Sequence, residues 1–139
     1  MALCLDASVA VAAFMPDPSR REAQDFVAAS ISRGERLVAP PLLLAETTSV
    51  LRRYVHLGTL QHDEAVAALQ DLLASPLHLN DRPHIYPRAL ELARRLGHGR
   101  AYDVQYLAVA EMESCPIVTL DRGLHESART LGIASRLIA

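Results

Sequence analysis

The sequence predicts an α/β domain with three layers, α/β/α, around a central parallel sheet of about four to five short strands. Two observations lead to this fold class. Short apolar segments of strand length alternate along the chain with longer segments that carry apolar residues at helical spacing. Prolines and glycines separate these segments, as expected for parallel strands that are joined through helices packed on both faces of a sheet.

The composition is that of one globular domain, which we expect to span residues 1–139. Hydrophobic residues make up 50% of the chain and charged residues 22%. No apolar run approaches the ~18 residues that span a membrane, and Asp6 interrupts the only apolar stretch near the N-terminus. We therefore expect a cytoplasmic protein without a signal peptide. Cys4 and Cys115 suit buried positions in a reducing compartment, and the sequence does not decide whether they form a disulfide.

The first strand is expected at residues 2–5 and leads directly into Asp6. A second apolar run at residues 9–14 predicts a short helix, and residues 16–19 mark the turn after it. The next helix is expected to follow this turn and to end at Gly34. The apolar stripe of this helix consists of Ala23, Phe26, Val27 and Ile31.

A helical hairpin is expected after the second strand, residues 36–39. Two prolines end that strand, and Pro41 suits the first position of a helix. The spacing predicts helices over about 42–56 and 63–74, which together form a hairpin at about 42–74. A brief strand is expected at residues 77–79 after the hairpin.

The last third of the chain repeats the opening pattern. We expect a helix at about 83–96, a loop at 97–100 and an apolar helix at 101–112. A β-branched strand at 116–120, a helix at 122–131 and an edge strand at 133–138 follow. Asp103 falls in the first turn of the apolar helix. The β-branched strand runs straight into Asp121, as the first strand runs into Asp6.

Four carboxylates occupy positions that such a fold can bring together. Asp6 and Asp121 each end an apolar strand, whereas Glu46 and Asp103 lie near the start of a helix. Strand ends and the first turns of the following helices meet at one edge of a parallel sheet, so all four could converge. Ordinary explanations exist as well. Asp6 and Asp121 could cap helices, and Asp103 could complement a helix dipole. Glu46 could form a salt bridge with Arg53.

A cluster of four carboxylates would need a cation. Two carboxylates ~4 Å apart repel each other by about 4 kcal/mol at an effective dielectric constant of about 20. A set of oxygen ligands, with no Cys or His residues at zinc-ligand spacing nearby, favours Mg²⁺ or Mn²⁺ over zinc. Such ions commonly act on phosphates, by polarising the phosphoryl oxygen and activating water.

Other α/β proteins also place an aspartate after the first strand. A haloacid-dehalogenase-type phosphatase would carry a second aspartate where Ser8 stands. It requires a lysine, as do receiver domains and P-loop NTPases, and the sequence contains none. A glycine-rich dinucleotide motif is also missing from the sequence. Ser8 lacks the elbow motif of a nucleophile, and His125 is either a general acid or a structural histidine.

The chain resembles the PIN-domain nucleases, and its small size makes it similar to the VapC-type toxin ribonucleases. The matching features occur in the same order along nearly the whole chain: Asp6-Ala7-Ser8, Pro41 followed by Glu46, Tyr102-Asp103, and Thr119-Leu120-Asp121. The resemblance implies a PIN-like fold and a divalent-metal-dependent endoribonuclease. Such an enzyme would hydrolyse RNA phosphodiester bonds with metal-activated water, as the toxin of a toxin–antitoxin pair.

The resemblance also assigns roles to residues and partners. It implies that the acidic site, which binds Mg²⁺ or Mn²⁺, consists of Asp6, Glu46, Asp103 and Asp121. Ser8 and Thr119 match positions that order the site through hydrogen bonds. A homodimer and a small VapB-type antitoxin that binds near the helical hairpin are further implications. Arg122 follows Asp121 without a further acid nearby, so the choice between one and two metal ions stays open.

Arginine supplies all 14 basic residues and is the expected contact for RNA phosphates. The formal net charge is −2, which becomes +2 when the four site acids are assigned to a metal. Aromatic residues make up only 4%, so a stacking platform for bases is not expected. The phosphate-binding candidates are Arg52, Arg53, Arg94, Arg95 and Arg100. The alternative function is a non-cleaving PIN-like module that binds RNA or protein.

Overall fold

The computed structural model describes residues 1–138, which form a five-stranded, fully parallel sheet. The strands lie in the order β3-β2-β1-β4-β5, so β1 is central, between β2 and β4. Their bounds are β1 (Ala2–Leu5), β2 (Arg36–Ala39), β3 (Leu77–Leu79), β4 (Ile117–Thr119) and β5 (Ser135–Leu137). The predicted fold class is confirmed.

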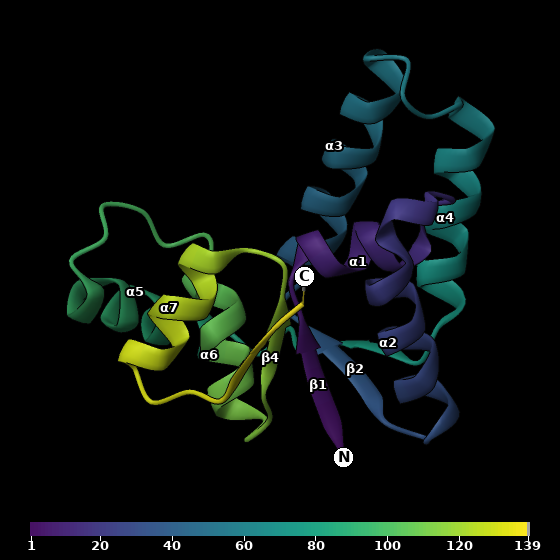
Figure 1. The fold of residues 1–139 in the computed structure, drawn as a ribbon. Coiled ribbons are helices and arrows are strands. Elements are labelled where there is room, and N and C mark those ends of the chain that lie inside the picture. Colours follow the sequence, from purple (N-terminus) through teal and green to yellow (C-terminus); the bar gives the residue numbers. More distant parts are fainter. Residues whose placement is uncertain (139) are drawn as a thin grey trace.

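Helices cover both faces of this sheet (Figure 1). They are α1 (Ala7–Phe14), α2 (Arg21–Ser32), α3 (Leu42–His56), α4 (His62–Ala74), α5 (Ile85–Leu96), α6 (Val104–Met112) and α7 (Arg122–Thr130), with a short 3-10 helix η1 (Pro18–Arg20). In the part of the chain that the structure describes, no helix has the length and apolar character to cross a membrane.

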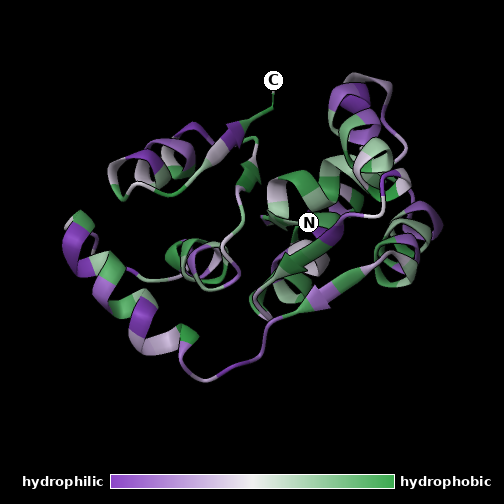
Figure 2. Cartoon of the chain, turned by 90° about the horizontal axis from the view of Figure 1, so that it is seen from below, coloured by the Kyte–Doolittle hydropathy of each residue, from purple (hydrophilic) through white to green (hydrophobic). Residues whose placement is uncertain are grey.

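Alternating side chains of β1 enter two separate hydrophobic cores. Leu3 and Leu5 pack on the side of α1 and α2, whereas Cys4 packs on the side of α5 and α6. On β2, Leu37 and Val38 divide in the same way. Figure 2 shows hydrophobic residues on the central strands and on the helix sides facing them. Burial on both faces explains why these strands read as continuous apolar runs in the sequence.

The predicted helical hairpin is formed by α3 and α4, which extend beyond the sheet edge reached by the carboxyl end of β1 (Figure 1). Gly58 lies in the connection with a φ of 78°, a left-handed conformation that favours glycine. A third apolar cluster, which includes Val11 of α1 and Met15 just after it, joins the hairpin to α1. The hairpin is therefore held against α1, the helix that begins after Asp6.

Two helices begin later than predicted. α5 begins at Ile85, two residues after the expected start at Pro83. α6 begins at Val104 instead of residue 101, so Asp103 is its N-cap residue and does not lie in the first turn. The backbone N–H of Tyr106 donates to the carbonyl of Asp103, three residues back (3.1 Å). Such a tight turn precedes the regular α-helical pattern, and sequence spacing does not reveal it.

Smaller differences concern strand lengths and the cysteines. The strands expected at 116–120 and 133–138 are shorter, at Ile117–Thr119 and Ser135–Leu137. Cys4 and Cys115 are both buried and both free, so the disulfide that the sequence left open is not formed.

Candidate active site at the carboxyl edge of the sheet

Asp6 is buried at the end of the central strand and is held by three hydrogen bonds. It is 5% exposed. Its Oδ1 accepts from the backbone N–H of Val9 (3.1 Å) and from the Ser8 hydroxyl (2.6 Å). Its Oδ2 accepts from the Thr119 hydroxyl on β4 (2.6 Å). Asp6 does cap α1, but its second oxygen is also fixed by a neighbouring strand.

Ser8 and Thr119 also connect this carboxylate to the end of β4. The Ser8 Oγ accepts from the backbone N–H of Leu120 (3.1 Å), and the Thr119 Oγ1 accepts from that of Asp121 (2.9 Å). Leu5 pairs with Val118 in the sheet, which brings the two strand ends side by side. The network therefore fixes Asp6 relative to Asp121.

Asp121 caps α7 with one carboxylate oxygen. Its Oδ1 accepts from the backbone N–H groups of Gly123 (2.7 Å) and Leu124 (3.2 Å). A Cβ atom added at Gly123 would lie 3.2 Å from this oxygen, so a larger residue would crowd the carboxylate. The capping interpretation is thus correct for Asp121, whose side chain remains exposed to solvent.

Burial raises the pKa of the Asp6 carboxyl, and the negative charge of Asp121 raises it further. The hydrogen bonds from Ser8, Thr119 and Val9 act in the opposite direction. The salt bridges found within residues 1–138 include none of the four site acids. Within the described residues, no basic side chain is therefore paired with these carboxylates.

Glu46 on α3 is held by a tyrosine that the sequence analysis did not single out. The Tyr106 hydroxyl on α6 donates to the Glu46 Oε1 (2.6 Å). Burial, followed by the Glu46 carboxylate, raises the pKa of Tyr106 well above its usual range, so the phenol stays protonated. The salt bridge considered between Glu46 and Arg53 is not formed in the described part of the chain. The signal for Tyr106 was a polar tip within an otherwise apolar helix.

Asp103 and Glu46 line one cavity of about 650 Å³. Its other walls come from the loop before α6, and they are Gly97, His98, Gly99, Arg100 and Tyr102. The Asp103 side chain is exposed and does not cap α6, so its carboxylate is available to a ligand. The Tyr106 hydroxyl, which donates to Glu46, connects this cavity to α6.

The four acids form two neighbouring pairs rather than one closed cluster. Asp6 is coupled to Asp121, and Glu46 shares a cavity with Asp103. As the side chains stand in residues 1–138, no three Asp, Glu, His or Cys residues are close enough to hold a metal ion. The ligand chemistry nevertheless fits a hard cation, because the groups are carboxylates and hydroxyls. Asp103 and Asp121 are exposed, and the second carboxylate oxygen of Asp121 is not used by the helix cap, so both side chains offer an oxygen to a ligand.

The other sequence candidates lie in different environments. His125 Nδ1 is 2.7 Å from the Ser135 Oγ, a contact between α7 and β5 that favours the structural interpretation of this histidine. Arg94 is paired with Glu91 on the same helix, α5 (2.9 Å between Nε and Oε2). Arg100 lines the cavity of Glu46 and Asp103. Of the remaining arginines, Arg52, Arg95 and Arg122 are exposed, and Arg53 lines a second cavity.

Comparison with known proteins agrees with this architecture. The chain is 30% identical over 129 residues to Ribonuclease VapC3 of Pyrobaculum aerophilum, covering 91% of this chain and 94% of that protein. The fold matches VapC20 of Mycobacterium tuberculosis, described as a Sarcin-Ricin loop cleaving toxin, with a TM-score of 0.70 and 19% identity over 95% of this chain and 96% of that one.

A second structure of the same fold is that of VapBC2 from Rickettsia felis, bound to a DNA fragment from their promoter. Its TM-score is 0.71, with 14% identity over 100% of both chains. The family model described as "PIN domain" matches residues 3–129, which include all four site acids. The chain therefore belongs to the PIN-domain family, as the resemblance predicted.

Proposed function

We propose that the protein is a divalent-cation-dependent endoribonuclease and the toxin of a toxin–antitoxin pair. Its relatives of 30% identity or more are named VapC ribonucleases, and they match about nine-tenths of the chain. The observation that carries the proposal is the buried Asp6 carboxylate, held by two hydroxyls and without a basic partner in residues 1–138. Three further acids stand at the same edge of the sheet.

The residues that would hold Mg²⁺ or Mn²⁺ are Asp6, Glu46, Asp103 and Asp121. When bound, such an ion polarises the phosphate and lowers the pKa of water. The chain itself orients the acids. Ser8 and Thr119 hold Asp6 in one conformation. The Tyr106 hydroxyl holds one oxygen of Glu46 and leaves the other for a ligand or a proton.

RNA phosphates would be bound by arginines that surround the acids. Arg100 is the sequence candidate that shares a cavity with Glu46 and Asp103. A guanidinium can hold two phosphate oxygens at once, whereas the acids repel the same phosphate unless a cation is present. RNA binding at the acids is therefore expected to depend on the cation.

Cleavage of RNA by the purified protein, without any antitoxin, tests the proposal. Structured RNAs are incubated with Mg²⁺ or Mn²⁺, with EDTA as one control and an Asp6→Asn variant as the other. We expect cleavage only by the wild type with cation, giving 5′-phosphate and 3′-hydroxyl ends. Cleavage that survives both controls would contradict the metal site. Binding without any cleavage would favour the alternative, a non-cleaving PIN-like module.

The proposal extends to partners. One structure of the same fold is a VapBC complex, and we propose a small VapB-type antitoxin that binds near the α3–α4 hairpin and reaches the acids. We also propose that the protein forms a homodimer and is located in the cytoplasm. Sedimentation of the protein alone and with its antitoxin tests the assembly, since a monomer at all concentrations would contradict the dimer.

A further inference from the structure

A second cavity lies beside the Asp6 network and shares no lining residue with the cavity of Glu46 and Asp103. Its volume is about 260 Å³. Ser8, which donates to Asp6, and Leu120, whose neighbour is Asp121, both line it. The cavity therefore lies beside the acids. Its walls are Ala7, Ser8, Val11, Ala12, Arg20, Val50, Arg53, Tyr54 and Leu120, and we call it the arginine cavity.

The charge in the arginine cavity is positive. Arg20 from η1 and Arg53 from α3 line it, and its walls include no acidic residue. Neither arginine takes part in a salt bridge within residues 1–138. The acid that interacts electrostatically with Arg20 is Asp17, whose Oδ1 is already bound by the backbone N–H (2.9 Å) and hydroxyl (2.8 Å) of Ser19. Two arginines thus line one cavity, and neither forms a salt bridge within the described residues.

One donor in this cavity lacks any acceptor. The Arg20 Nε is shielded from solvent and makes no hydrogen bond within the described residues. Buried polar groups are satisfied in nearly all native structures, so an unsatisfied one indicates a missing ligand. The adjacent walls are small and apolar, at Val11, Ala12 and Val50, and a low dielectric constant strengthens a charge-assisted bond to an anion.

We infer that the arginine cavity binds one phosphate group of the RNA strand, next to the phosphate that is cleaved. The inference rests on the proposed nuclease function and adds a specific subsite with Arg20 and Arg53 as its ligands. When one phosphate of the RNA lies at the acids, the neighbouring phosphates of the RNA backbone lie on either side of it. The arginine cavity includes Ser8, which donates to Asp6, so a phosphate next to the cleaved one can reach it. A protein carboxylate is the competing occupant, and the experiments below distinguish the two.

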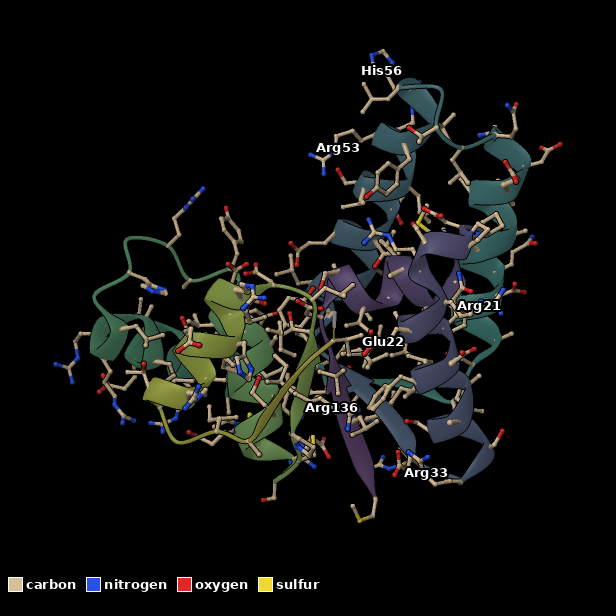
Figure 3. All side chains as sticks on the ribbon, viewed as in Figure 1. Arg21, Glu22, Arg33, Arg53, His56 and Arg136 are labelled. Atoms are coloured by element: carbon tan, nitrogen blue, oxygen red, sulfur yellow. The ribbon has the colours of Figure 1, made fainter. Side chains whose placement is uncertain are left out.

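Binding of a short 2′-O-methyl RNA, with Ca²⁺ in place of Mg²⁺ as the oxygen-ligated cation, tests the subsite without cleavage. Arg20→Gln and Arg53→Gln are compared with Arg21→Gln, a neighbour of Arg20 on α2. Arg21 lies on α2, apart from Arg53 on α3 (Figure 3), and does not line the arginine cavity. We expect each subsite variant to weaken binding roughly tenfold. The slope of log affinity against log salt should fall by about 0.7, the value for one lost phosphate on single-stranded RNA. Arg21→Gln should match the wild type.

The Arg20 Nε–H signal in a ¹⁵N–¹H spectrum reports on this cavity directly. The RNA should shift the signal, and a glutamate-rich peptide of equal charge should not. A larger shift with the peptide would overturn the phosphate subsite in favour of a protein carboxylate. Wild-type affinity and salt slope in both subsite variants, with unchanged circular dichroism, would also overturn it. If the wild type cuts no RNA but RNA shifts Arg20, the nuclease proposal fails and the subsite stands.

Discussion

Asp6 and Glu46 are both held by hydroxyl groups, and this choice of donor affects the charge of the site. A hydroxyl stabilises an ionised carboxylate through a hydrogen bond but adds no positive charge. Ser8 and Thr119 do this for Asp6, and Tyr106 does it for Glu46. An arginine in the same place would have neutralised the acid. The hydroxyls therefore leave the negative charge for a cation.

Replacing Tyr106 with Phe tests the role assigned to its hydroxyl. The ring still fills its buried position, but Glu46 loses its donor. We expect the rate of RNA cleavage to fall at least about tenfold, since a hydrogen bond to a charged group contributes ~1.5–3 kcal/mol. The free energy of unfolding should change by only about 1 kcal/mol, because Glu46 can be hydrated. Single-turnover cleavage and urea unfolding measure both, and an unchanged rate would remove Tyr106 from the site.

The two buried cysteines make stability depend on alkaline pH. Burial raises the pKa of the Cys115 thiol to about 11, with a further contribution from Glu113, and burial raises that of Cys4 as well. A cysteine in the unfolded chain ionises near pH ~8.5, so the unfolded state loses protons that the folded state retains. Stability is therefore fully present below pH ~8.5 and falls as the pH rises toward the folded pKa.

Urea unfolding under reducing conditions at about pH 8 and about pH 10 measures this effect. Each thiol should lower the free energy of unfolding by up to ~1.4 kcal/mol per pH unit above ~8.5. Cys115→Ala should reduce the loss, since one of the two thiols is removed. Equal pH dependence in the variant and the wild type would show that Cys115 does not retain its proton.

Single residues differ in how far the sequence could predict them. Asp6 and Asp121 were found because each ends an apolar strand, and parallel strands end at one edge. The contact of Tyr106 with Glu46 joins residues 60 positions apart, and only the fold, which brings a side chain of α6 to one of α3, creates it. Arg20 escaped notice for the same reason, since one turn of 3-10 helix places it near Arg53.

Among the helices that are directly preceded by a site acid, α6 is the most buried. Val104 and every residue from Tyr106 to Ala110 are buried, with Asp103 just before them. α6 lies against β1, β2 and α5. Its position therefore fixes Asp103 and Tyr106 relative to the sheet. The sequence predicted this helix from its apolar run but placed its start three residues too early.

A pair of leucine truncations tests how much α6 contributes to stability. Leu107 on α6 is 0% exposed, whereas Leu90 on α5 is 69% exposed. We expect Leu107→Ala to lower the free energy of unfolding by about 2–5 kcal/mol. Leu90→Ala should change it by no more than about 0.5 kcal/mol. Equal effects in urea unfolding would show that α6 does not pack as described.

At the scale of the whole molecule, the order of the strands assembles the site. β1 and β4 are neighbours, so the acids that follow them, Asp6 and Asp121, lie together. The sequence predicts parallel strands but not their order, because the buried strands have similar compositions. One cavity is lined by Glu46 and Asp103, and another is lined by Arg20, Arg53 and Ser8, which donates to Asp6.

We propose that the four acids bind a divalent cation around Asp6. Electron paramagnetic resonance of free Mn²⁺ during a titration measures this binding without substrate. We expect the wild type to bind Mn²⁺, and Asp6→Asn, with unchanged circular dichroism, to bind it at least about tenfold more weakly. Equal Mn²⁺ affinity in the two proteins would contradict this proposal.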